Sequence, residues 1–144
     1  MTTTFRADIR AGLVTVLQGF KTANPTLLGS VLSARPEGFT GDYPVAFVDS
    51  QPEDIVHDSG TRTRTMTAVV AVVAEKTLNA EEQARFDILV DTLLDYFTAN
   101  PHIITGTIWD RMRVEDYAEV IGEQYRPGVR FGFENLSIQE GRSP

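Results

Sequence analysis

His57 and Asp58 form the residue pair that comes closest to a chemical site in this chain of 144 residues. Adjacent His and Asp side chains can bind a metal ion, and Asp54 stands three residues before His57, so the set could serve a small metal-dependent hydrolase. Such a site needs further ligands, and the second histidine, His102, directly follows a helix-breaking proline. Because the local pattern is typical of a strand and a turn, we expect a polar turn here and keep the hydrolase as the alternative interpretation.

Three aspartates at a spacing of four residues make a second charged pattern, formed by Asp87, Asp91 and Asp95. On a helix this spacing places the carboxylates on one face, where they can meet a divalent cation or a basic partner. The sequence offers no further ligand beside them. We therefore interpret the pattern as a solvated face that, if it binds anything, contacts another subunit.

The third charged group consists of arginines on predicted strands or at strand ends: Arg62, Arg64, Arg111, Arg113, Arg126 and Arg130. A row of arginines can bind nucleic acid, but the net charge of this chain is -7. An acidic total disfavours an electrostatic grip on phosphates. We expect these arginines to pair with acidic neighbours, within the chain or across subunits.

Sequence motifs of common enzyme sites are missing from the chain. It has no cysteine, no Gly-x-Ser-x-Gly sequence and no phosphate loop of the GxGxxG or GxxxxGK type. Thiol chemistry, disulfides and cysteine-based metal sites are therefore excluded, and a nucleophile elbow or a nucleotide-binding loop has no support. We expect a structural protein that has no catalytic residues and binds neither a metal nor a cofactor.

The N-terminal residues give no sign of export or of a membrane anchor. The start MTTTFRADIRAG lacks the basic-then-apolar order of a secretion signal. The longest apolar run, Ala68 to Ala74, is far shorter than the roughly 20 residues that a membrane helix needs. We expect a protein made in the cytoplasm that has no membrane partner.

The stretch from Thr61 to Glu75 predicts the element on which the fold depends, a long strand that changes character halfway. In its first half, threonines on one face alternate with Arg62, Arg64 and Met66 on the other. In its second half both faces are apolar, which indicates a strand covered on both sides. The polar half must therefore leave the core and run into solvent or onto another chain.

This polar half is expected to form a protruding arm of residues 50–67. The segment Glu53 to His57 can pair with it across a turn at Asp58-Ser59-Gly60. If the arm docks on a neighbour, reversing the charges of Arg62 and Arg64 should leave the fold intact and block assembly. The residues that we expect at subunit or partner interfaces are Glu53, Asp54, His57, Arg62, Arg64, Asp87, Asp91 and Asp95.

Two amphipathic helices are predicted. The first has its apolar residues at helical spacing, with Thr3 or Thr4 as its cap: Phe5, Ile9, Leu13, Val16, Leu17 and Phe20. The second begins at a capping box of Asn79 and Glu82 and carries a longer stripe: Phe86, Leu89, Val90, Leu93, Leu94 and Phe97. Proline follows each helix. We expect each helix to cover one face of the sheet, since a two-sided strand needs two covers.

Three further strands are predicted at Pro44 to Asp49, Thr107 to Val120 and Tyr125 to Ile138. The last two are joined by a hairpin at Ile121 to Gln124. In the first of these two, alternation predicts one apolar face: Ile108, Met112, Val114, Ala118 and Val120. In the second, apolar residues switch parity near Glu134-Asn135, which indicates a β-bulge.

The order of elements predicts an α+β fold, a mostly antiparallel or mixed sheet flanked by two main helices. The length and the absence of a linker indicate one domain, residues 1–144, with a frayed end at 141–144. The segment Leu27 to Pro36 is compatible with a short strand or a helical turn.

The order of elements and several short sequence segments resemble those of the tail terminator (tail completion) proteins of long-tailed bacteriophages. The resemblance covers nearly the whole chain. It rests on the N-terminal amphipathic helix and on four later segments: Arg35-Pro36 with Tyr43-Pro44-Val45-Ala46-Phe47-Val48, the strand Arg62 to Val73, the helix Glu81 to Phe97, and Val129-Arg130-Phe131-Gly132-Phe133-Glu134. These are patterns of strand and helix, so no residue roles carry over.

The resemblance implies a small α+β subunit of a virion, located at the head-proximal end of the tail. Such subunits form a ring, expected to be a hexamer, that caps the tail tube and stops its polymerisation. The ring also offers a surface to the head-completion or connector protein, and DNA passes through it as non-specific cargo. An acidic lumen would repel DNA phosphates and let DNA slide. A neck or head-tail joining protein is the alternative within the same class.

Overall fold

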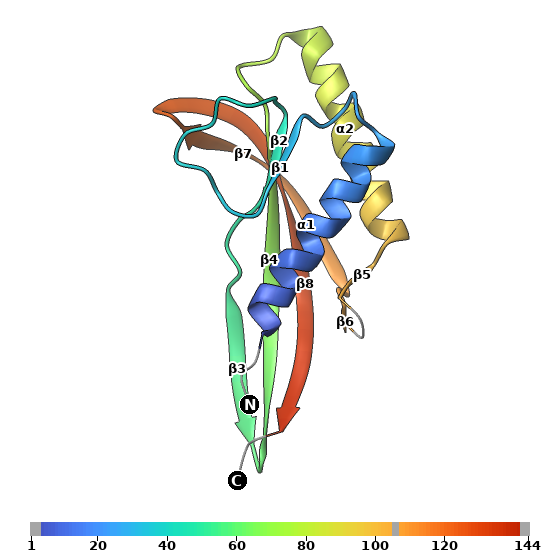
Figure 1. The fold of residues 1–144 in the computed structure, drawn as a ribbon, viewed down its shortest axis with the longest axis vertical. Helices are drawn as coiled ribbons and strands as arrows, with labels where there is room; N and C mark the ends of the chain where they lie inside the picture. Colours follow the sequence, from blue (N-terminus) through green and yellow to red (C-terminus); the bar gives the residue numbers. More distant parts are fainter. Residues whose placement is uncertain (1–3, 105–106, 142–144) are drawn as a thin grey trace.

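Strand β4, Thr61–Val73, lies at the centre of the sheet and pairs with three other strands. The computed structural model describes residues 4–104 and 107–141. Figure 1 shows the elements, which follow in the order α1 (Phe5–Ala23), β1 (Ser30–Leu32), β2 (Val45–Val48), β3 (Glu53–Asp58), β4 (Thr61–Val73), α2 (Ala80–Ala99), β5 (His102–Ile104), β6 (Thr107–Ile108), β7 (Arg111–Ile121) and β8 (Gln124–Gly141).

The main sheet has the strand order β1-β2-β4-β8-β7, and β3 pairs with the first half of β4. All of its pairs are antiparallel except β1 with β2. The α+β class with a mostly antiparallel, mixed sheet is therefore confirmed. The segment that the sequence left open contains the short parallel strand β1, and β5 with β6 forms a separate two-stranded sheet.

The change of character within β4 is confirmed. Its last four residues, Val70 to Val73, are all buried, because β2 and β8 flank them and side chains cover both faces. Its first half continues past the core with β3 on one side and the end of β8 on the other. Gly60 has φ +76° at the predicted turn between β3 and β4, a conformation that suits glycine.

The bulge expected near Glu134-Asn135 is also present. The register of β4 against β8 shifts there, so that Thr67 alone faces Glu134 and Asn135. Asn135 has a φ of +63°, and its Nδ2 donates to the carboxylate of Asp110 at 2.8 and 3.1 Å. The extra residue turns both Phe133 and Leu136 into the core and so explains the switch of parity.

The helix boundaries agree with the predicted caps. At α2, Asn79 and Glu82 form both hydrogen bonds of a capping box, at 2.9 and 3.1 Å. At α1, Thr4 occupies the N-cap position, but its hydroxyl donates to the Asp8 carboxylate at 2.7 Å instead of accepting from a backbone amide. Thr3, the other predicted cap, lies outside the described residues, as do residues 142–144 of the expected frayed end, whereas Gly141 belongs to β8.

The expectation that the two helices cover opposite faces of the sheet is wrong. The buried residues of α1 and α2 lie in one cluster with Val70 and Val72, so both helices cover the same face, here called the helix face. The helices also contact each other, and Phe20 meets Tyr96 edge to face at 5.5 Å. On the opposite face, a smaller cluster of described residues that includes Phe39 and Tyr43 covers β2 and the end of β4.

The predicted apolar face of β7 is wrong as well. Val114 and Val120 are each 41% exposed, whereas Glu119 and Ile121, of the other parity, are buried. β7 is the outermost strand, and its helix-side residues are not part of the cluster formed by the helices, apart from Met112 at its edge. The loop before β2 instead contacts the opposite face of β7, where Arg35 donates from Nε to Glu119 at 2.8 Å and Ile121 packs in one cluster with Phe39.

We predict that Leu93→Ala lowers the free energy of unfolding by about 2–5 kcal/mol, because Leu93 is fully buried between α2 and the sheet. Chemical denaturation measures the change. Ile88→Ala is the matched control on the same helix, since Ile88 is 55% exposed, and should change it by less than about 1 kcal/mol. Equal effects of the two substitutions would contradict the packing of α2.

Candidate functional site

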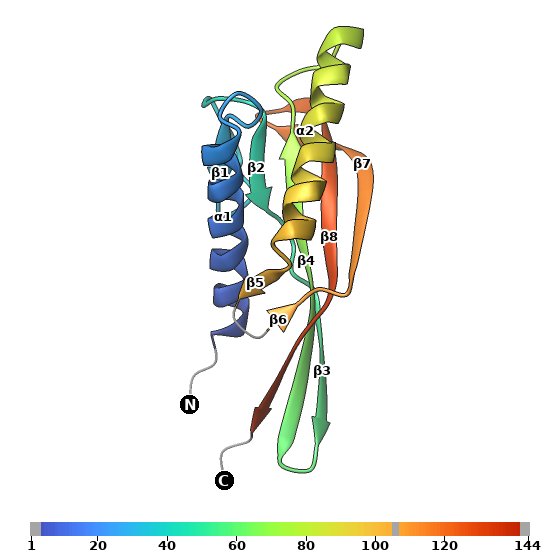
Figure 2. The same cartoon turned by 90° about the vertical axis from the view of Figure 1, so that its right-hand side faces the viewer.

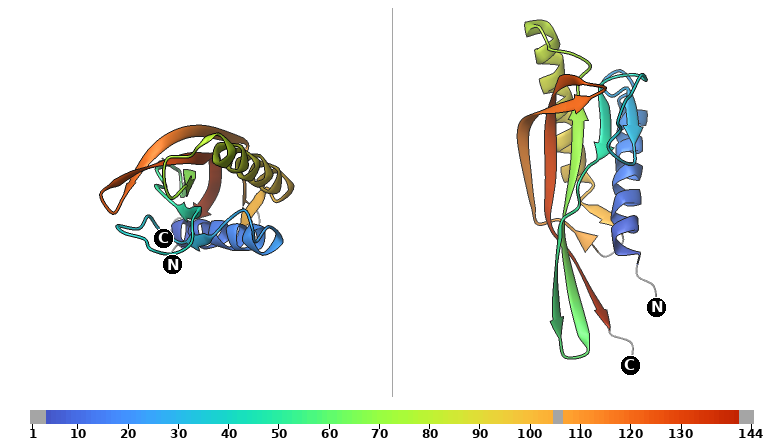
Figure 3. Two further views of the ribbon diagram at one scale, coloured as in Figure 1. Left: turned by 90° about the horizontal axis from the view of Figure 1, so that it is seen from above. Right: turned by 90° about the vertical axis from the view of Figure 1, so that its left-hand side faces the viewer.

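The arm is the most distinctive surface of the structure. It consists of β3, residues 61–66 of β4 and residues 136–141 of β8, and it extends beyond the helices (Figures 1 and 3). Apart from Met66 and Leu136, which are buried at its base, the arm residues with described side chains are largely polar or exposed. Within the described part of the chain, no strand pairs with the outer edge of β3 or with residues 136–141 on their outer side. The arm therefore carries two open β-edges.

An ion pair between Glu53 and Arg64 joins β3 to β4 at the base of the arm. Arg64 donates from Nε to Oε2 of Glu53 at 3.1 Å and from a terminal nitrogen to Oε1 at 2.9 Å. The Arg64 side chain is only 7% exposed, and its guanidinium lies 5.3 Å from the centre of the Phe5 ring. Two-pronged pairing and an aromatic contact fix both side chains in one geometry.

Arg6 extends this pair to helix α1. Its Nη1 donates to the Gln51 carbonyl at 2.8 Å and to Glu53 at 3.3 Å. We call Arg6, Glu53 and Arg64 the clasp, because together they tie the arm to the start of α1. The hydrogen bond from Arg64 is the main cause that holds the pKa of Glu53 below its ordinary value, with the Arg64 charge and Arg6 adding to it against the effect of burial.

The clasp changes the meaning of the two predicted arm arginines. Arg62 and Arg64 are two residues apart on one face, and the sequence-based prediction placed both of them at the docking interface. The structure places Arg64 inside the chain, where it binds Glu53, while Arg62 lies farther along the arm opposite His57. A charge reversal at Arg64 therefore acts on the fold of the arm itself, so Arg62, which lies outside this ion pair, is the residue used to test docking.

The remaining predicted residues of β3 are exposed, as are Ile55 and Val56 beside them. Side chains alternate along a strand, so Asp54 and Asp58 lie on one face and His57 on the other. The three residues of the hydrolase alternative therefore do not converge. In the described ranges, no group of three or more His, Asp or Glu side chains is arranged to hold a metal ion.

The aspartate face of α2 is separate from the arm. Asp87, Asp91 and Asp95 are exposed, on the side of the helix away from its buried residues. Asp87 accepts from Nε2 of Gln83 at 2.9 Å. The structure does not bring these carboxylates together with the arm residues, since α2 packs on the body of the domain while the arm extends beyond it (Figure 2). The predicted interface residues therefore form two distinct surfaces.

A network of polar side-chain contacts on the face opposite the helices was not predicted. Arg130 lies 3.7 Å from Asp49 and 4.0 Å from the centre of the Tyr117 ring. The Tyr117 hydroxyl donates to Glu119 at 3.0 Å, and Arg35 donates from Nε to the same carboxylate at 2.8 Å. Burial and the neighbouring Glu119 raise the pKa of Tyr117. In the sequence, Tyr117 and Glu119 alternate with the apolar Ala118 and Val120, and this alternation predicted the other face of β7 as the buried one.

Pairing of strand arginines with acidic neighbours is confirmed for Arg64, Arg111, Arg113 and Arg130. Arg111 and Arg113 share Glu134 at 3.7 and 3.9 Å, and both remain largely exposed. Such long, solvated pairs contribute at most about 1 kcal/mol. These two arginines are therefore available to other acidic groups.

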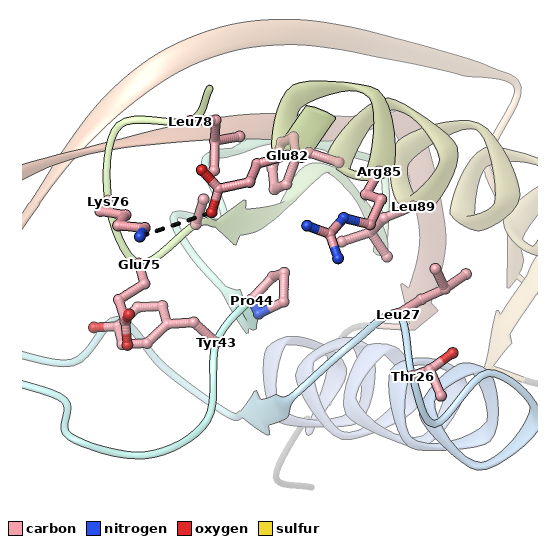
Figure 4. Close-up of a pocket in the computed structure, with 12 residues that line it drawn as sticks. Thr26, Leu27, Tyr43, Pro44, Glu75, Lys76, Leu78, Glu82, Arg85 and Leu89 are labelled. Carbon is pink, nitrogen blue, oxygen red and sulfur yellow. Dashed lines mark ion pairs between the residues drawn. The ribbon is translucent and has the colours of Figure 1, made fainter. Parts of the chain in front are cut away.

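Cavities also occur on the surface of the described residues. One of about 310 Å³ lies between the start of α2, the end of β4 and the loop before β2, with Leu27, Pro44 and Leu89 in its walls (Figure 4). At its rim Lys76 lies 3.8 Å from Glu82. Another, of about 260 Å³, lies on the face opposite the helices between Arg113 and Arg130. Neither cavity collects the predicted interface residues.

No family model matches the chain, and the comparison with curated proteins found no match. Among the described helices, none is long and apolar enough to cross a membrane.

We predict that Arg64→Ala lowers the free energy of unfolding by about 3 kcal/mol, because it leaves the largely buried Glu53 without its main partner. Arg111→Ala, which removes an exposed pair, is the control and should change it by less than about 1 kcal/mol. Urea denaturation of both variants measures the difference. Similar small changes would show that the clasp does not stabilise the arm.

The clasp also predicts a pH dependence. The pKa of Glu53 is lower in the folded state, so its contribution is complete above the ordinary value of 4.5 and is lost as the pH falls through the folded pKa. The free energy of unfolding should therefore fall below pH 4.5, and it should fall less steeply in Glu53→Gln. Denaturation curves over this pH range compare the two proteins; identical slopes would contradict the role of Glu53.

Proposed function

We propose that this protein is a structural subunit of a bacteriophage tail, a tail terminator that forms a ring on the tail tube and stops its polymerisation. The observation that carries the proposal is the arm, a β-structure with two open edges that is held rigidly to the body by the clasp. Open β-edges of this kind are templates for pairing with another chain. A subunit that assembles through one repeated contact has a use for such an arm.

The charge of the chain supports the same proposal. A net charge of -7 suits the wall of a conduit, since a negative lumen repels DNA phosphates and does not hold the DNA in transit. The resemblance of the strand, helix and C-terminal phrases to tail terminator proteins agrees with this use. In this proposal the partners are other copies of the chain, the tail tube protein and the head-completion protein.

A neck or head-tail joining protein is the second candidate, because it would use the same kind of ring and the same surfaces. The two differ in what fails without the protein. Loss of a terminator leaves tube growth unchecked, whereas loss of a joining protein leaves tails of normal length that do not attach to heads. The hydrolase alternative, based on Asp54, His57 and Asp58, is tested separately by metal analysis of the purified protein.

We predict that a phage lacking this chain produces overlong tails without heads and that the wild-type chain restores normal tails. Electron microscopy of lysates measures tail length and head attachment. Tails of normal length without heads would favour the joining protein, and normal virions would rule out both.

The arm is tested in the same complementation by Arg62→Glu, which reverses a charge on the arm and leaves the clasp unchanged. We predict near-normal thermal melting together with overlong or headless tails, because like charges brought together at an interface cost several kcal/mol. Lys76→Glu, an exposed charge reversal at the other end of β4, is the control and should restore normal tails. Normal tails with both variants would remove Arg62 from the assembly contact.

A further inference from the structure

Strand β7 forms a long open edge on one side of the sheet. It pairs with β8 over eleven residues, from Arg111 to Ile121, and no other described strand pairs with it (Figure 2). From Arg113 to Asp116 its side chains are exposed on both faces, and Val114 is 41% exposed. Soluble proteins usually shorten or cover such an edge. An uncovered one of this length therefore indicates a strand that another chain completes.

Strand β3 forms the corresponding edge on the other side. The strands β3, β4, β8 and β7 are neighbours in that order, and each pair is antiparallel. β3 and β7 consequently run in opposite directions. If a second copy in the same orientation is placed beside the first, its β3 meets β7 in antiparallel pairing, the arrangement that continues the sheet. Strand order alone thus allows a head-to-tail contact.

Two pairs of side chains on the two edges match as well. On the face opposite the helices, β7 presents Arg111 and Arg113, and β3 presents Asp54 and Asp58. On the helix face, β7 presents Val114 and β3 presents Ile55, which is 47% exposed. In the register that places Ile55 opposite Val114, Asp58 faces Arg111, whereas Asp54 faces Glu115 and lies diagonal to Arg113. The apolar pair and the Asp58–Arg111 pair are of kinds that stabilise a sheet, and they must outweigh the opposed carboxylates of Asp54 and Glu115.

We propose that β3 of one copy pairs with β7 of a second copy of this chain, so that the arm of each subunit completes the sheet of the next. The contact is heterologous, which means that it repeats from copy to copy and forms a ring when the rotation closes. It names the self-contact of the proposed ring and rests on that proposed function for its biological role.

The stagger between the two edges decides whether a ring can close. β3 lies beside residues 61–66 of β4, whereas the arginine half of β7 lies level with residues 67–72. This offset of about six residues shifts each copy by roughly 20 Å along the strands relative to its neighbour. The four strands of one copy span roughly 19 Å across the sheet. Closure then needs strands inclined by about 45° to the ring axis, at the upper end of the range in closed β-barrels.

Disulfide trapping tests the contact directly, because the natural chain has no cysteine. We predict that the double variant Ile55→Cys, Val114→Cys forms a ladder of covalent dimers, trimers and larger species on mild oxidation. The two positions cannot join within one chain, since two strands separate β3 from β7 and place them roughly 14 Å apart or more. Denaturing electrophoresis without reductant displays the ladder.

The single variants Ile55→Cys and Val114→Cys are the matched controls and should form no ladder. Adding Arg111→Glu and Arg113→Glu to the double variant should remove the ladder, and adding Asp54→Lys and Asp58→Lys to that protein should restore it. Absence of a ladder at the highest soluble concentration overturns the proposal, as does a dimer formed by either single variant, which would indicate a two-fold contact.

The outcomes separate this contact from the function proposed above. If the protein terminates tails but gives no ladder, the proposed function stands and the proposed β3–β7 contact is wrong. If the protein gives the ladder but its loss changes neither tail length nor head attachment, the proposed contact stands and the proposed function is wrong.

Discussion

The continuous pairing of β4 with β8 is the constraint on which the rest of the structure depends. It runs from Thr61 to Val73 with one bulge, and it joins a buried sheet to a polar arm without a hinge between them. Because both strands continue from the body into the arm, the arm cannot move independently unless ladder hydrogen bonds break. The bulge turns the apolar residues of β8 back toward the core, so the core extends to the base of the arm.

The clasp acts at the point where this core ends. Past Met66 the arm has few buried apolar side chains, and a three-stranded ribbon of this kind is marginal without packing on a helix. Here the hydrogen bonds of Glu53 with Arg64 and Arg6 attach the arm to helix α1, and the Arg64 guanidinium packs against the Phe5 ring of α1. A rigid arm loses little conformational entropy when it binds, which favours assembly through a modest contact area.

Much of the fold follows from local patterns in the sequence. The two-sided half of β4, the capping box at Asn79 and the bulge near Asn135 were predicted, because each depends on residues that are neighbours in sequence or periodic along one element. The placement of both helices on one face was not predicted, since periodicity shows that a helix has a buried side and does not show which face of the sheet that side meets. The parity of β7 was missed because β7 is an edge strand outside the cover of the helices, so its apolar residues Val114 and Val120 remain exposed.

The candidate site shows the same division. Sequence alone identified the arm and its charged residues, but it could not separate Arg62 from Arg64, which have the same residue type and the same strand parity. The difference between them is the position of Phe5 and Glu53 beside Arg64, a contact made across the fold. The network of polar contacts from Asp49 to Arg35 likewise joins segments far apart in sequence and becomes visible only in three dimensions.

The central claim is that this chain closes a ring at the end of a tail tube through its arm. A cryo-electron microscopy reconstruction of the head-proximal tail end tests it most directly. The account predicts a closed cyclic ring of copies in one orientation, with the arm of each copy against β7 of its neighbour. A single copy, a two-fold dimer, or a ring in which the arms contact no other chain would contradict it.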